Sequence, residues 1–109
     1  MPNSYNKLIR DRIPEIIRRN GHVCELEIMS AEEYGQALRE KLIEEAMEAA
    51  SASGYDLLTE LADLYEVMNA LMKINHIDFA QVRTIQEQRR AERGGFEQRI
   101  RLLRTMVSE

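Results

Sequence analysis

Apolar residues recur with helical spacing through the middle of the chain. When residues 57–74 are placed on a helix at about 100° per residue, their apolar side chains fall in one sector on a single face. This sector comprises Leu57, Leu61, Leu64, Val67, Met68, Leu71 and Ile74. An earlier apolar stripe is formed by Tyr34, Leu38, Leu42 and Ala49. The pattern predicts two long amphipathic helices, each with one face turned towards a core.

Capping residues predict where these two helices begin and end. Ser30-Ala31-Glu32-Glu33 has the form of a capping box, so a helix is expected from there to about Ala52. Ser53-Gly54 interrupts the pattern, and Asp56 is a candidate N-cap for a second helix that continues to about Ile74. Because the connection is this short, the two helices are expected to be antiparallel neighbours.

Shorter elements are predicted before the first long helix. Pro14 suits the first turn of a short helix, and Gly21 suits its end. Residues 23–28 alternate apolar and acidic side chains, which favours either a short strand or an extended connector. Cys24 lies in this alternation, where a core thiol is favoured over a nucleophile.

A third long helix is predicted towards the C-terminus. Asp78 followed by Gln81 resembles an N-terminal cap, and Gly94-Gly95 is expected to end the helix. The tail from Phe96 to Met106 fits a helix or an extended segment equally well, because its period does not choose between them. These elements predict an all-α protein, a compact antiparallel helical bundle with at most one short N-terminal strand.

Composition predicts one helical domain over residues 1–109. Hydrophobic residues make up 44% of the 109 residues and charged residues 31%, and only five Gly and two Pro occur. That balance is typical of globular, helix-rich proteins. The net charge of −4 argues against binding to nucleic-acid polymers, whereas a small phosphorylated ligand needs only a local basic patch. A single cysteine, a polar N-terminus and the lack of an apolar run of about 20 residues predict a cytoplasmic protein without a membrane segment.

Several acidic residues fall on the apolar faces of the two central helices. Glu60 projects into the apolar sector of its helix, and Asp63 lies beside it at the edge of that sector. Glu45 lies within the apolar arc of the preceding helix, flanked by Glu44 and Glu48. Antiparallel pairing of the helices is therefore expected to make these five carboxylates face one another.

Acids that converge away from water need a cation, a proton or a basic partner. A cluster whose donors are all oxygens suits a hard divalent ion, so we expect Mg²⁺, with Mn²⁺ as a substitute. The alternative is a set of solvated acids in which Lys41 pairs with Glu44 or Glu45. A di-iron bundle would need a His three residues after a Glu on paired helices, and neither His22 nor His76 has that spacing.

The acidic motifs resemble a known signature. Glu44-Glu45-x-x-Glu48 followed by Glu60-x-x-Asp63 is similar to that of the MazG-like all-α nucleoside triphosphate pyrophosphohydrolases. The opening Asn6-Lys7-Leu8-Ile9-Arg10-Asp11-Arg12-Ile13-Pro14 and the later Arg93-Gly94-Gly95-Phe96 resemble the phosphoribosyl-ATP pyrophosphohydrolase-like branch, so the matches span nearly the whole chain. The resemblance implies a homodimer or homotetramer in which the five acids bind Mg²⁺. It also implies cleavage of a nucleoside triphosphate between the α and β phosphates, with Glu44 or Glu45 as the base that activates water.

Basic residues near these motifs are candidate phosphate ligands, because guanidinium and ammonium groups bind phosphate oxygens. They are Lys7, Arg10, Arg12, Lys41, Arg90 and Arg93. An ordinary charged surface would also contain such residues. The substrate stays open between a standard or damaged nucleoside triphosphate and phosphoribosyl-ATP, and a non-catalytic helical interaction module is the alternative from another class of function.

Overall fold

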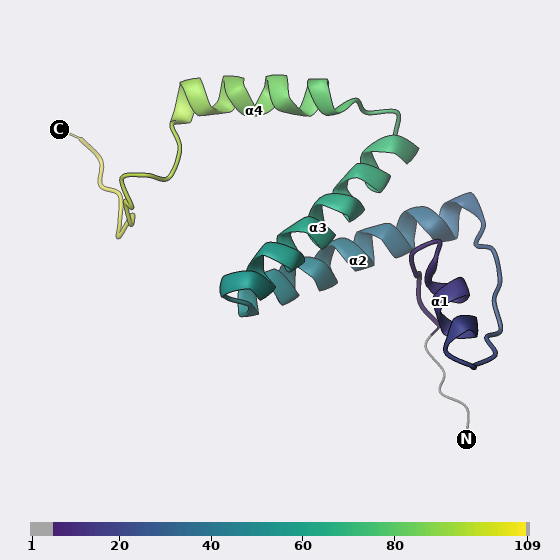
Figure 1. The fold of residues 1–109 in the computed structure, drawn as a ribbon. Helices are drawn as coiled ribbons and strands as arrows, with labels where there is room; N and C mark the ends of the chain where they lie inside the picture. Colours follow the sequence, from purple (N-terminus) through teal and green to yellow (C-terminus); the bar gives the residue numbers. More distant parts are fainter. Residues whose placement is uncertain (1–5, 109) are drawn as a thin grey trace. The chain divides into compact units, whose positions relative to one another are not determined.

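The computed structural model describes residues 6–108 and contains helices and irregular segments. The helices are α1 (Ile13–Arg19), α2 (Ala31–Ser51), α3 (Gly54–Ile74) and α4 (Phe79–Arg93), as Figure 1 shows. No strand occurs among residues 6–108, so the all-α prediction is confirmed. The chain divides after His76 into two compact units, and the prediction of a single domain over residues 1–109 stays a prediction.

The segment before α2 is an irregular connector, and the predicted alternative of a short strand there is wrong. Val23 and Ile28, at the two ends of the alternation, are 97% and 96% exposed. An alternating segment forms a strand only when a neighbouring strand takes up its backbone hydrogen bonds, and this segment has none within the described residues. Cys24 is a free, half-buried thiol, and its predicted role as a core thiol stays a prediction.

The predicted capping box at the start of α2 is confirmed. The Glu33 backbone N–H donates to Ser30 Oγ at 3.1 Å, and the Ser30 backbone N–H donates to Glu33 Oε1 at 3.0 Å. Two of the backbone donors that a helix start leaves without intrahelical partners are thereby satisfied. The backbone hydrogen bond also lowers the pKa of Glu33, because it stabilises the ionised carboxylate.

Helix α3 begins earlier than predicted. Its N-cap is Ser53 and its first residue is Gly54, so the prediction that Asp56 caps it is wrong. Gly54 has φ +59, a backbone conformation that residues with a Cβ rarely adopt, and this lets the chain reverse within very few residues. Asp56 instead lies in the first turn, where a negative charge is favourable beside the helix N-terminus.

Helices α2 and α3 pack against each other along the chain reversal, as predicted for antiparallel neighbours (Figure 1). Leu38 of α2 and Val67 of α3 are the buried apolar residues of the core, 3% and 7% exposed. Around them lie half-buried members of the two predicted apolar stripes, namely Leu42, Leu64, Met68 and Leu71. The stripes therefore meet where the sequence pattern places them, except at Leu61, whose predicted place on the buried face is wrong because it is 42% exposed.

Helix α1 has the boundaries that its sequence signals predict. Pro14 lies in its first turn, and Gly21, with φ +83, follows its end. Arg12 and Arg19 are exposed and pair with Glu15 on the surface of this helix. These exposed pairs contribute little to stability.

The second unit, from Ile77 onward, contains α4 and an irregular tail. The predicted cap is confirmed, because the Asp78 backbone N–H donates to Gln81 Oε1 at 2.7 Å within a capping box. Gly94, at φ +82, ends the helix as predicted. The tail up to residue 108 is not helical, which settles the alternative between a helix and an extended segment. Within residues 6–108, none of the helices combines the length and apolarity that crossing a bilayer requires.

Candidate metal centre

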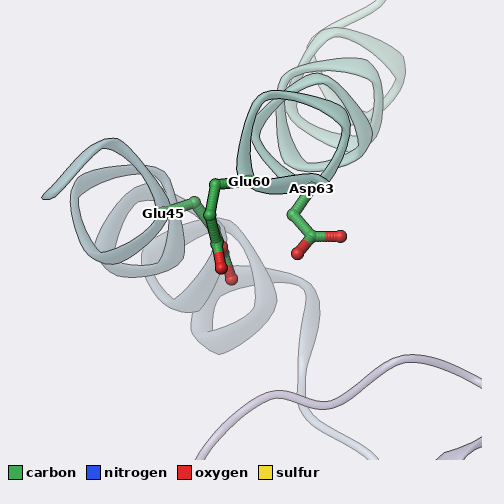
Figure 2. A group of neighbouring side chains, drawn as sticks. All are labelled: Glu45, Glu60 and Asp63. Carbon is green, nitrogen blue, oxygen red and sulfur yellow. The ribbon is translucent and has the colours of Figure 1, made fainter. Parts of the chain in front are cut away.

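Three carboxylates from two helices converge at the α2–α3 interface. Glu45 comes from α2, and Glu60 and Asp63 come from consecutive turns of α3. One oxygen of each lies within 4.8 Å of the others. Figure 2 shows the Glu45 and Glu60 side chains extending the same way from facing helices, with Asp63 beside them. We call these three residues the carboxylate triad.

Two oxygens of the triad, one from each helix, are shielded from water. Glu45 is 8% exposed, the one buried charged residue among those described, and Glu60 and Asp63 are half-buried. Glu45 Oε2 and Glu60 Oε2 are buried and accept no hydrogen bond from the described residues. A buried acceptor without a partner costs about 1–3 kcal/mol, and more when it is charged. These two orphaned oxygens fit a bound cation, and an all-oxygen donor set fits Mg²⁺ or Mn²⁺.

The triad also perturbs the acidity of its members. Burial raises the pKa of Glu45 to about 6, and the charges of Glu48 and Asp63 raise it further, whereas Lys41 opposes the shift. Burial likewise raises the pKa of Glu60, with added repulsion from Glu48 and Asp63. Both shifts follow first from burial of the carboxylates and second from the neighbouring negative charges.

Glu44 and Glu48 were predicted to complete the site, and both lie outside the triad. The Glu44 side chain is 44% exposed, and its Oε2 lies 3.9 Å from Lys41 Nζ. Lys41 Nζ is also 3.9 Å from Glu45 Oε1, so the predicted pairing alternative holds in part. Glu48 is exposed, yet its charge acts on both Glu45 and Glu60. The geometry thus separates an inner group of acids from outer acids that neighbour it.

Among the predicted phosphate ligands, Arg10 lies at the triad. Its Nη2 donates to Asp63 Oδ1 at 2.7 Å, across 53 residues of sequence. Lys41 is also adjacent, through Glu45. Lys7 is exposed, and Arg12 pairs with Glu15 at 3.3 Å instead of with the triad.

The two remaining candidates belong to the second unit. Arg90 Nη2 donates to Glu97 Oε1 at 2.6 Å, which lowers the pKa of Glu97, and Arg93 is exposed near the end of α4. Their contribution to a phosphate site stays a prediction.

The contact that sequence reasoning missed is the one between Arg10 and Asp63. Both residues had been singled out separately, Arg10 for its basic patch and Asp63 for its place at the edge of an apolar sector. No spacing rule links positions so far apart, because the link depends on where the chain before α1 runs past α3. The sequence therefore offered no signal for the contact itself.

Comparison with known proteins assigns no family. No protein-family profile matches the chain, and no solved structure matches it. A stretch of 54 residues is 43% identical to an uncharacterized protein of Mycolicibacterium smegmatis, covering 50% of this chain and 55% of that protein. The chain thus spans about half the length of the curated relative it matches. These matches carry no activity, so any functional conclusion depends on the chemistry of the carboxylate triad.

Proposed function

We propose that this protein is a Mg²⁺-dependent nucleotide pyrophosphohydrolase that cleaves the bond between the α and β phosphates of a nucleoside triphosphate or a related nucleotide. One observation carries the proposal. Buried oxygens of Glu45 and Glu60, without partners among the described residues, converge with Asp63 on facing helices. Two such acids on a folded apolar face are costly unless a cation joins them.

The chemistry of the donors favours this class of substrate. Mg²⁺ dehydrates reluctantly, keeps several waters and is usually bound by one or two carboxylates together with substrate phosphates. A triad of this size leaves room in the coordination shell for phosphate oxygens. When bound, Mg²⁺ offsets phosphate charge and polarises the bond that breaks.

The residues of the chain supply the remaining steps. Hydrolysis needs a water whose proton is removed as its oxygen forms a new bond to phosphorus, while the anhydride P–O bond breaks and pyrophosphate leaves. Glu45 and its neighbour Glu44 are the proposed acceptors of that proton. Glu44 is half-exposed outside the triad, so it can take up a proton without giving up a triad contact.

The resemblance to MazG-like enzymes supports the same proposal. It implies the phosphoribosyl-ATP pyrophosphohydrolase-like branch and a homodimer or homotetramer, and the single cysteine supports a cytoplasmic location. The substrate would then be a standard or damaged nucleoside triphosphate, or phosphoribosyl-ATP. Arg10 and Lys41, the two basic candidates beside the triad, are the first expected phosphate ligands.

A pyrophosphate-release assay tests the proposal. Purified protein is incubated with a panel of standard and oxidised nucleoside triphosphates and phosphoribosyl-ATP, with Mg²⁺ or with a chelator. We expect release of a monophosphate and pyrophosphate from at least one substrate, and loss of the activity on chelation. Absence of turnover on every nucleotide in the presence of Mg²⁺ and Mn²⁺ would contradict the proposal.

A helical interaction module is the second candidate, and exposed apolar residues favour it. Ile43 and Met47 of α2 are 61% and 66% exposed, and Leu58 and Tyr65 of α3 are 63% and 59% exposed. A helix pair with so much uncovered apolar surface is suited to a partner. This candidate predicts no change in thermal stability with Mg²⁺, whereas the enzyme predicts an increase.

A further inference from the structure

One cationic side chain of the protein already donates a hydrogen bond to the acidic cluster. Residues 6–12, which precede α1, are called here the N-terminal arm. Its Arg10 donates through Nη2 to Asp63 Oδ1 at 2.7 Å, and the two side chains are 55% and 42% exposed. Within residues 6–108, Asp63 is the one triad member that accepts a hydrogen bond from a cationic side chain.

The Arg10 contact leaves two buried oxygens of the triad without a hydrogen-bond partner. Lys41 Nζ stays 3.9 Å from Glu45 Oε1, a distance too long for a hydrogen bond. The buried Oε2 atoms of Glu45 and Glu60 receive nothing from either cation. A divalent ion at the triad would therefore bind the two orphaned oxygens and share Asp63 with Arg10. Two cations on one carboxylate repel each other, so each weakens the binding of the other.

We propose that Arg10 is a tethered counter-ion that a divalent ion displaces from Asp63, and that this exchange frees the guanidinium for a phosphate group of the substrate. The inference rests on the proposed function and adds a sequence of events to it. The metal ion binds first, and the N-terminal arm is released from Asp63 as a consequence. The contact is suited to exchange, because a half-exposed ion pair is weak and its geometry is not locked by burial. A freed guanidinium presents a planar fork of donors that matches phosphate oxygens.

Metal binding in the absence of nucleotide tests the exchange. Free Mn²⁺ is followed by its electron paramagnetic resonance signal during titration of wild type, Arg10→Gln and Arg12→Gln at about 0.15 M salt, where the screening length is about 8 Å. Arg10→Gln is expected to bind Mn²⁺ about two- to fivefold more tightly than wild type, the range of a partly exposed ion pair. Arg12→Gln removes the same charge from the same arm but contacts Glu15, so it is expected to match wild type.

Amide hydrogen exchange measures whether the N-terminal arm is released. A general change in the electrostatic field at the metal site would not alter this measurement. Saturating Mn²⁺ is expected to raise exchange in residues 6–19 of wild type, because the arm loses its anchor on α3. In Arg10→Gln, exchange there should be high from the start and unchanged by Mn²⁺. Circular dichroism establishes that each variant is folded, and Arg10→Lys, which keeps the charge but loses the fork, should fall between wild type and Arg10→Gln in both measurements.

The outcomes separate this inference from the proposed function. Mn²⁺ affinity of Arg10→Gln equal to or weaker than that of wild type would overturn the exchange while leaving the metal site intact. Equal tightening in Arg12→Gln, with no change in arm exchange, would also overturn it. If wild-type protein binds neither Mn²⁺ nor Mg²⁺, the proposed function fails, and the exchange fails with it.

Discussion

Acidic residues lie both on the inner face of the α2–α3 pair, where the two helices meet, and on its outer face, which is exposed. Their burial and their hydrogen bonding differ between the two faces. Glu44 and Glu45 are adjacent in sequence, yet the Glu44 side chain is 44% exposed whereas Glu45 is 8% exposed with an unpartnered oxygen. On α3, Glu60 turns inward, and Glu66 is exposed. A rotation of about 100° between successive helical positions is enough to separate them. The comparison teaches that position on the helix pair, and not residue type, sets the chemistry of these acids.

The largest expected effect comes from neutralising one inner acid and one outer acid of the same helix. Glu60→Gln removes a triad ligand while keeping the shape of the side chain, so pyrophosphate release should fall by roughly a hundredfold or more, as loss of metal-based charge stabilisation implies. Glu66→Gln makes the same chemical change on the exposed face and should retain activity. Both are measured by initial rates at saturating Mg²⁺, and equal rates in the two variants would remove the distinction between the faces.

Metal-linked stability is the next largest effect. A ligand that binds only the folded state stabilises it by about 2.7 kcal/mol at roughly 100 times Kd. Mg²⁺ should therefore raise the Tm of wild type and of Glu66→Gln by several degrees, as followed by differential scanning fluorimetry. Asp63→Asn, which removes a triad charge, should lose most of that rise. A Tm in wild type that does not respond to Mg²⁺ or Mn²⁺ would favour the interaction module instead.

The pH dependence of stability without metal should show the inner acid directly. The pKa of Glu45 is about 6 in the folded chain against 4.5 ordinarily, so the folded state holds its proton more tightly. The free energy of unfolding therefore decreases as the pH rises from about 4.5 to 6. Above that window the loss of stability caused by ionised Glu45 stays constant. Glu45→Gln lacks this deficit and should be more stable than wild type at pH 7 by at most about 2 kcal/mol.

Urea unfolding at pH 4.5, 5.5 and 7 in chelator measures this difference. Glu44→Gln is the matched control, since it makes the same chemical change one residue away on a side chain that is 44% exposed. Saturating Mg²⁺ should abolish or reverse the advantage of Glu45→Gln. An advantage that does not grow between pH 4.5 and 7 would show that burial of Glu45 costs the fold nothing.

Local signals predicted most helix ends, whereas the long-range contact at the site depended on packing. Ser30 with Glu33, Gly21 and Gly94 mark helix ends through their own backbone bonds or φ values, so their positions could be predicted without knowing the fold. The prediction that Asp56 is the N-cap of α3 was wrong because two residues with good capping side chains, Ser53 and Asp56, lie close together. The sharp reversal at Gly54 makes Ser53 the N-cap.

The residues of the candidate site also differ in whether the sequence could predict them. Glu45, Glu60 and Asp63 were predictable from helical phase. Arg10 on Asp63 was not, because an approach across 53 residues is set by tertiary structure alone. Glu44 lies outside the triad because it is one helical position from Glu45 and therefore points about 100° away from it. The sequence pattern placed both residues at the apolar arc of α2 and did not separate them.

The smallest expected effect separates the fold from its chemistry. Ser30→Ala removes the side-chain acceptor of the Glu33 backbone N–H and should cost about 1 kcal/mol of stability. Ser30 begins α2 fifteen residues before Glu45, four helical turns from the triad, so Mn²⁺ affinity and turnover should stay at wild-type values below the melting transition. Urea unfolding measures the first quantity and Mn²⁺ titration the second. If Ser30→Ala weakened Mn²⁺ binding as much as Asp63→Asn does, the triad would depend on the whole length of α2, and the contrast between inner and outer acids would no longer be a local one.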